Sequence, residues 1–218
     1  MTYETLLKAA QTRNLDIFGA FHPEDEDLAP SGTKTLLLLG PHEPGFWPHV
    51  SAQSEFSDGL PDPLDRWSKR VVSDWARALG ATPVYPSDGP PYPPFIRWAL
   101  RSERAWSSPV AMLVHDRAGL FVSYRAAITL PQRIALPERN AANPCETCDT
   151  KPCVTACPVS AITEIQYDVP TCKTFLDTTE GKDCRFNGCG VRRACPISTT
   201  YGRLAEQSAF HMDAFHPQ

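Results

Sequence analysis

The most regular hydrophobic pattern in the chain lies between Asp62 and Gly80, where apolar side chains recur every three or four positions. The positions concerned are Leu64, Trp67, Val71, Trp75, Ala78 and Leu79. This spacing puts them on one side of an α-helix. Asp62 followed by Pro63 is a typical capped helix start, and Gly80 is a typical stop. We therefore predict a helix over this segment whose tryptophan side packs against a sheet.

Three further apolar segments predict β-strands. The run Thr33–Gly40 is too short and too apolar for a surface helix, so we predict a buried strand there. Val110–His115 and Leu120–Leu130 have the composition of strands, and a turn at Asp116–Gly119 would join them into a β-hairpin. The proline-rich segment Ser87–Pro94 predicts a stiff loop. Together these elements predict an α+β fold for the first part of the chain.

The composition is that of a globular protein. Of the 218 residues, 42% are hydrophobic and 21% are charged, which allows a folded core and argues against extensive disorder. The longest aliphatic run, Leu36–Leu39, is far shorter than the roughly 20 residues of a membrane span. The formal charge of −4 is unlike that of most nucleic-acid-binding proteins. We therefore expect neither a membrane nor a nucleic acid as partner, and the sequence of Met1–Asn14, which lacks a basic and apolar leader, predicts a cytoplasmic protein.

The cysteines divide the chain into two parts. All eight lie between Cys145 and Cys195, whereas all five tryptophans precede residue 144. The polar segment Pro137–Pro144 separates the two compositions. We predict an N-terminal domain over residues 1–140 and a C-terminal domain over residues 141–218. In a reducing cytosol, clustered cysteines bind metal far more often than they form disulfides.

The spacing of the eight cysteines predicts two iron–sulfur clusters. A [4Fe–4S] cluster takes four thiolates, so eight cysteines hold two clusters. In such modules the last cysteine of a short run precedes a proline, sits on the following helix and binds the other cluster. The two Cys-Pro pairs here begin at Cys157 and Cys195. By this logic one cluster takes Cys145, Cys148, Cys153 and Cys195, and the other takes Cys157, Cys172, Cys184 and Cys189.

The alternative is a pair of zinc sites that only stabilise a small domain. Zinc ribbons usually contain two separated cysteine pairs with two residues inside each pair. In this sequence Cys145 and Cys148 alone have that spacing. The repeated Cys-Pro ending also favours iron–sulfur clusters over zinc.

The cysteine region resembles the bacterial-ferredoxin module at the end of epoxyqueuosine reductases and reductive dehalogenases. The resemblance covers roughly residues 119–198, with both cysteine runs and the segment Cys172–Leu176, in which an aromatic residue follows a lone cysteine. In those enzymes two clusters pass electrons to a cobalamin. The gaps are longer here, because four residues stand where two are usual in both runs, and five residues precede Cys195.

The first part of the chain is similar to the CblC cobalamin-processing chaperones, which have a nitroreductase-like α+β fold. The similarity rests on Thr35–Gly40, on the helix start Asp62–Asp65 and above all on Val114–Ala127. Proteins of that family bind cobalamin and remove its upper axial ligand with electrons from a thiol or a reduced flavin. The resemblance implies a cofactor-binding role for Arg117, which matches an arginine at the family's thiol-binding site. It also implies a corrinoid, or less readily a flavin, as the ligand.

Four polar residues of the first part invite a functional interpretation, and we interpret each as structural. Asp88 resembles the general acid of epoxyqueuosine reductases, but it also suits a turn between prolines. His42 and His49 flank a loop, and His115 lies at the predicted hairpin turn. Isolated histidines of this kind are more often surface or structural residues than ligands. We likewise interpret the aromatic residues Trp67, Trp75, Trp98 and Trp106 as core side chains.

Three arginines, Arg185, Arg192 and Arg193, surround the second cysteine run. Positive charge beside an iron–sulfur cluster favours its reduced form and raises its reduction potential. Such arginines would also attract an acidic electron donor. The other interpretation, ordinary surface arginines, remains open.

We therefore predict a two-domain redox protein. A CblC- or nitroreductase-like domain would bind a corrinoid, and a small bacterial-ferredoxin-like domain would pass it single electrons from a donor protein. The chemistry would be reduction of cobalt, with loss of an upper ligand when one is present, and no catalytic acid or base is predicted. One alternative is an electron carrier that docks on a separate oxidoreductase and has no substrate of its own. The other alternative is the structural zinc module.

Overall fold

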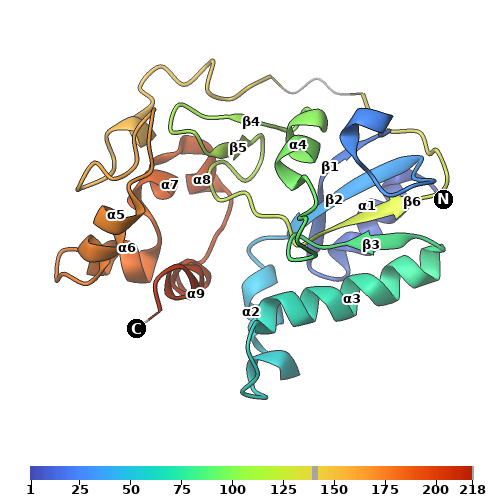
Figure 1. Ribbon diagram of the computed structural model, residues 1–218, viewed down its shortest axis with the longest axis horizontal. Helices are drawn as coiled ribbons and strands as arrows, with labels where there is room; N and C mark the ends of the chain where they lie inside the picture. Colours follow the sequence, from blue (N-terminus) through green and yellow to red (C-terminus); the bar gives the residue numbers. More distant parts are fainter. Residues whose placement is uncertain (139–141, 218) are drawn as a thin grey trace. The chain divides into compact units, whose positions relative to one another are not determined.

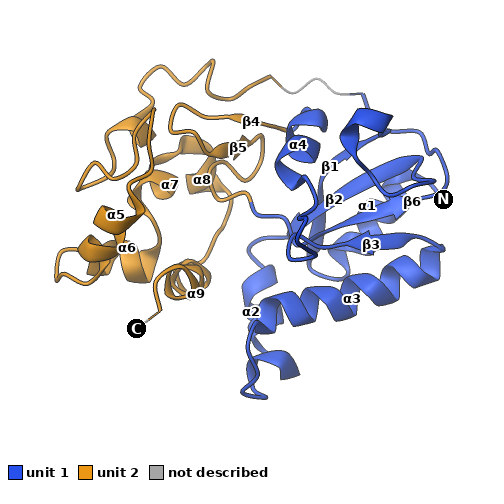
Figure 2. Ribbon diagram, in the orientation of Figure 1, with its two compact units in different colours: residues 1–104, 123–140 blue, residues 105–122, 141–218 orange. Residues whose placement is uncertain are grey.

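A computed structural model of the chain describes residues 1–138 and 142–217 (Figure 1). The chain forms two compact units, each assembled from two segments (Figure 2). Unit 1 consists of Met1–Arg104 and Ser123–Asn140, and unit 2 consists of Ala105–Val122 and Ala141–Gln218. The predicted boundary after residue 140 falls outside the described residues. The segment Ala105–Val122, which the composition placed with the N-terminal part, belongs to the second unit.

Unit 1 is built on a four-stranded sheet in which every neighbouring pair of strands is antiparallel (Figure 1). In spatial order, the strands are β1 (Leu15–Phe21), β2 (Thr35–Pro41), β6 (Ala126–Leu130) and β3 (Thr82–Val84). Every residue of β1, β2 and β6 is buried, so the centre of the sheet is covered on both faces. Strand β2 confirms the predicted buried strand. Strand β1 was not predicted, because Asp16 and Gly19 interrupt its apolar run.

Helix α3 (Pro63–Leu79) confirms the predicted helix and contacts β3 and β6 of the sheet. Its buried side carries Trp67 and Trp75 as predicted, although Ala78 is exposed. The capping role predicted for Asp62 is wrong: its φ of 53° is left-handed and its side chain makes no capping hydrogen bond. A capping side chain normally projects from an extended backbone. The other helical elements of unit 1 are α1 (Tyr3–Gln11), α2 (Phe46–Ser51) and α4 (Phe95–Arg101), with the 3₁₀ turns η1 (Asp25–Asp27) and η2 (Ser54–Phe56).

The β-hairpin predicted over Val110–Leu130 is wrong. Strand β5 (Leu113–His115) pairs with β4 (Ala105–Ser107) in a separate two-stranded sheet of unit 2. The backbones of His115 and Gly119 exchange hydrogen bonds of 3.0 and 2.9 Å, which close a tight turn. The extended part of the predicted second strand is β6, which lies between β2 and β3 in unit 1. The apolar pattern misled because the residues before and after Ser123 contribute to two separate cores.

Unit 2 consists mainly of short helices (Figure 1). They are the 3₁₀ turn η3 (Pro152–Val154) and the helices α5 (Val169–Leu176), α6 (Lys182–Asn187), α7 (Gly190–Ala194), α8 (Pro196–Thr200) and α9 (Ala205–Phe215). The apolar core combines Val110, Val114 and Leu120 with residues of the cysteine region, such as Cys153 and Val191. This shared core explains why the segment before residue 123 belongs to unit 2. The chain as a whole is mixed α/β, and no helix among its described residues is both long and apolar enough to cross a membrane.

Candidate metal centre

Four cysteines gather around the core of unit 2, and we call them group A. Cys145 and Cys148 lie in turns near the start of the second segment, Cys153 lies in η3, and Cys195 joins α7 to α8. Burial raises the pKa of the Cys145 thiol, and the charges of the other three members raise it further. Burial also raises the pKa of Cys153, with contributions from Cys195 and Cys148. The four sulfurs are therefore close enough to influence one another's ionisation.

The other four cysteines form a second set, group B. Cys172 lies in α5, Cys184 in α6, and Cys189 directly precedes α7. Cys157 lies in a turn, so its predicted place on a following helix is wrong, whereas Cys195 of group A does stand at the start of α8. Burial raises the pKa of Cys172, a hydrogen bond from a tyrosine lowers it, and the charges of the other three members raise it. The structure thus brings together the same two sets of four that the spacing assigned.

The donor set suits a metal centre with several ions. All eight cysteines are free thiols, and crowded, partly buried thiols resist ionisation unless positive charge is present. A bound metal reverses this preference, because it takes cysteine as the thiolate. No three or more His, Cys, Asp or Glu side chains in the described ranges 1–138 and 142–217 are arranged to hold a single ion. Four cysteine thiolates are the donor set of a [4Fe–4S] cluster.

Hydrogen-bond donors reach three of the four sulfurs of group B. The backbone amide of Ala161 donates to Cys157 Sγ at 3.1 Å. The Tyr167 hydroxyl donates to Cys172 Sγ at 3.9 Å. The amide of Gly190 donates to the cysteine of α6 and opposes the rise in its pKa that burial causes. These donors stabilise negative charge on sulfur, which is the charge that a thiolate ligand carries.

Comparison with known proteins gives one structural neighbour. No protein-family model matches the chain. No curated protein matches it either. Among solved structures, a crystal structure of selenomethionine-labelled epoxyqueuosine reductase matches with a TM-score of 0.48 and 15% sequence identity. The match covers 91% of this chain and 66% of that protein, so the chain spans less than two thirds of its neighbour.

The arginines beside the second cysteine run are engaged by the fold. Arg185 is buried and donates to Asp213 Oδ1 at 2.8 Å, which joins α6 to α9. Arg193 pairs with Asp183, and its positive charge also opposes the rise in the pKa of the α6 cysteine. Arg192 donates to a backbone carbonyl in the first segment of unit 2. These side chains hold unit 2 together and place positive charge beside group B.

Arg117 belongs to unit 2, because it lies in the segment Ala105–Val122. Its side chain is exposed, and its backbone amide donates to His115 Nδ1 at 3.1 Å. The same nitrogen accepts from the Ala118 amide at 3.2 Å, and His115 is completely buried, which agrees with its structural interpretation. The segment Val114–Ala127, on which the resemblance to the CblC chaperones mainly rests, is divided between the two units.

The remaining candidate residues of unit 1 have structural partners. The Asp88 carboxylate accepts from the Tyr85 amide at 2.9 Å and lies 3.4 Å from Lys69 Nζ, as expected for a residue that shapes a turn. His42 Nδ1 lies 3.3 Å from the carboxylate of Asp16, a buried residue of β1. Of the tryptophans interpreted as core side chains, Trp67, Trp75 and Trp98 are buried in unit 1, whereas Trp106 is half-buried and belongs to unit 2.

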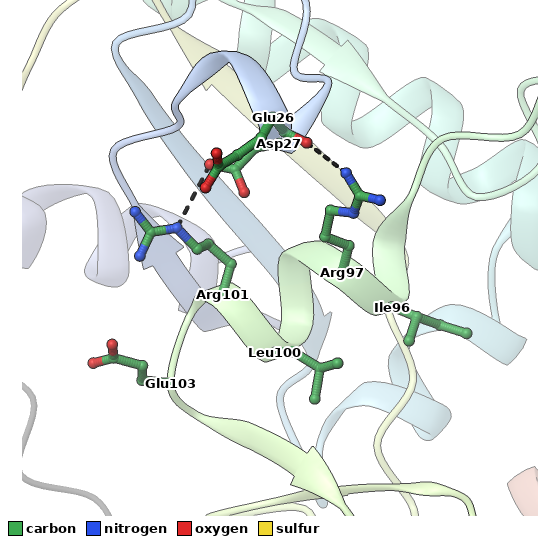
Figure 3. A pocket seen from close by; sticks show the side chains of 7 residues that line it. All are labelled: Glu26, Asp27, Ile96, Arg97, Leu100, Arg101 and Glu103. Carbon is green, nitrogen blue, oxygen red and sulfur yellow. Dashed lines mark hydrogen bonds and ion pairs between the residues drawn. The ribbon is translucent and has the colours of Figure 1, made fainter.

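An open cavity of about 670 Å³ in unit 1 was not predicted (Figure 3). It lies between η1 and α4, where Arg101 Nε is 3.6 Å from Oδ2 of the buried Asp27. Arg97 donates to the backbone carbonyl of Glu26, and Ile96 on the same helix leaves its apolar side chain exposed. The partners are about seventy positions apart in sequence, so no local pattern could have revealed them. None of the predicted site residues lines this cavity.

Proposed function

We propose that unit 2 holds two [4Fe–4S] clusters and that the protein transfers electrons one at a time. The observation that carries this proposal is that each group of neighbouring cysteines includes one cysteine from the other run. Group A includes Cys195 from the second run, and group B includes Cys157 from the first. Such an exchange is typical of two-cluster ferredoxins. A zinc site that only staples a small domain does not require it.

The chain's own part in this function is to hold and shield eight thiolates. Pro158 follows Cys157, and Pro196 follows Cys195. Each proline fixes the backbone φ angle and has no N–H group that would need a hydrogen-bond partner. The amides of Ala161 and Gly190 stabilise negative charge on group B sulfurs. When bound, each cluster supplies a centre that gains or loses a single electron. No acid–base residue is needed, because no bond to a substrate is made or broken in electron transfer.

The first test measures the metal content of protein purified without oxygen. We expect about eight iron and eight acid-labile sulfide per chain, with a broad absorption near 400 nm. Cys148→Ser in group A and Cys189→Ser in group B should each remove about half of the iron, because each disrupts one cluster. Thr155→Ser, an exposed change between two cysteines of the first run, is the matched control and should leave the iron content unchanged. Zinc without sulfide would refute the proposal and support the structural zinc module.

The acceptor of the electrons is a separate question. A corrinoid remains a prediction that rests on the sequence resemblance, and Arg117 remains its predicted contact. The test is to titrate the reduced protein, and an Arg117→Ala variant, with hydroxocobalamin while recording the visible spectrum of the corrinoid. Reduction that weakens in the variant would support the corrinoid as acceptor. An unchanged corrinoid spectrum would favour an electron carrier for a separate oxidoreductase.

A further inference from the structure

The two groups of cysteines differ in the donors that reach their sulfurs. In group B, two backbone amides and a tyrosine hydroxyl reach three different sulfurs. In group A, the backbone amides of Cys153 and Val154 both donate to the Cys153 sulfur. Hydrogen bonds to ligand sulfurs stabilise the more negative, reduced state of a cluster and so raise its reduction potential. The pattern of donors therefore favours reduction at group B.

Positive charge lies beside both groups and does not distinguish them. Arg193 places positive charge beside the cysteine of α6 in group B, although its partner Asp183 offsets part of that charge. In group A, the positive charge of the exposed Lys151 lowers the pKa of Cys145.

Tyr167 supplies a side-chain hydroxyl to group B, and its ring is held by the C-terminal helix. The ring stacks on Phe215 of α9 with centroids 6.1 Å apart and planes 16° from parallel. Lys173 Nζ lies 5.2 Å from the centroid of the Phe215 ring. Helix α9 packs on α6, to which the pair of Arg185 and Asp213 also joins it. The position of the hydroxyl near Cys172 therefore depends on the docking of α9.

We infer that the two sites have different reduction potentials, that group B holds the higher one, and that Tyr167 is a positioning residue that raises it through Cys172. This inference rests on the proposed function. With a cluster bound at each site, this difference would favour transfer of one electron from the group A site, which would be oxidised, to the group B site, which would be reduced. No bond is made or broken and no proton is transferred in that step. An electron that enters at group A would leave from group B.

The test is a redox titration of the cluster-loaded protein without oxygen, followed by electron paramagnetic resonance. The signal altered in Cys148→Ser identifies group A. We expect two midpoint potentials, with the higher one at group B. In Tyr167→Phe, that potential alone should become more negative, so that the ratio of reduced to oxidised group B at a fixed applied potential falls about fivefold, the effect of one ordinary hydrogen bond. Tyr92→Phe, which removes an exposed phenol hydroxyl from unit 1, should change neither potential.

A second variant preserves the test if Tyr167→Phe does not retain both clusters. Phe215→Leu keeps the hydroxyl but removes the ring that holds it, so it should shift the group B potential in the same direction by a smaller amount. Equal potentials, a higher potential at group A, or no selective shift in either variant would overturn the inference. These outcomes are distinct from failure of the proposed function, which would appear earlier as a chain without iron and sulfide.

Discussion

At the residue scale, Gly119 fixes how the two segments of unit 2 meet. Its φ of 56° lies in the left-handed region that favours glycine. A Cβ added at this position would lie 2.5 Å from the backbone nitrogen of Ser198. Ser198 in turn accepts a hydrogen bond from the Leu120 amide on its Oγ at 2.9 Å. The turn after β5 therefore packs directly on α8, the helix that begins next to a cysteine of group A.

We predict that Gly119→Ala destabilises unit 2 more than its backbone angle alone would require. The left-handed conformation costs an alanine about 1–2 kcal/mol, and forced movement of packed backbone adds about 1–3 kcal/mol. Gly59→Ala is the control, because Gly59 has a φ of 74° and open space around it. Hydrogen exchange of the amides around each substituted glycine, which for Gly119 include those of α8, measures the loss of local stability. Equal losses of local stability in the two variants would show that the contact with Ser198 is unimportant.

The sequence could place Gly119 in a turn but could not show its contact with Ser198. The same limit applies to the cysteines. Their spacing predicts two sets of four, and the thiols of each set lie close enough to affect one another's pKa. The hydroxyl of Tyr167 near Cys172 was not predicted, since that contact depends on Phe215 in a helix more than forty residues away.

At the scale of elements, a partly buried ion pair joins η2 to α3. Arg70 Nε lies 2.5 Å from Oε1 of Glu55, whose side chain is only 8% exposed. The hydrogen bond from Arg70 lowers the pKa of Glu55 below its ordinary value of 4.5, although burial opposes the effect. A carboxyl group whose pKa is lowered in the folded state stabilises that state when it is ionised. Its contribution is complete above pH 4.5 and is lost as the pH falls through the lowered pKa.

We therefore predict that Glu55→Gln lowers the free energy of unfolding at pH 7 and that its difference from the parent protein shrinks below about pH 4.5. Urea unfolding between pH 7 and pH 3 measures this convergence. Glu180→Gln, an exposed change in unit 2, should show no comparable dependence on pH. A constant difference across the range would mean that the charge of Glu55 is not the stabilising feature.

The elements whose apolar residues follow one regular pattern along the sequence were predicted correctly. Helix α3 has a continuous tryptophan side, and β2 is a run of leucines, so both follow from local pattern. Strand β1 was missed because its buried Asp16 pairs with His42 and breaks the apolar pattern. The pairing of β5 with β4, and of β6 with β2 and β3, depends on contacts between distant segments. No pattern inside a single segment contains that information.

At the scale of the whole molecule, the cysteines belong to one unit and the main sheet to the other. We predict that removing iron with a chelator and an oxidant loosens unit 2 and leaves the sheet of unit 1 folded. Without metal, the crowded thiols of each group no longer link distant segments. Hydrogen–deuterium exchange should rise in η3 and α7 and stay unchanged in β2 and β6. A uniform rise across all four elements would contradict independent stability of the two units.

The sequence shows that the chain has two parts of different composition. It does not show that the segments of the two units alternate along the chain. Cysteine and tryptophan counts change near residue 144, and they suggested two successive domains. The structure instead assigns Ala105–Val122 to unit 2, because Val110, Val114 and Leu120 complete the core around the cysteines. An apolar side chain in the sequence predicts burial, but it does not predict which of the two cores the side chain joins.

The interleaved order has a consequence for synthesis on the ribosome. Strand β6 separates β2 from β3 and pairs with both, yet it is translated after them and after the excursion into unit 2. A nascent chain halted before residue 126 would expose two unpaired strand edges, which are prone to aggregation. For the same reason a gene fragment that stops at residue 140 would carry Val110, Val114 and Leu120 without their partners. The two modules are therefore inherited together, since no single cut in the gene separates them.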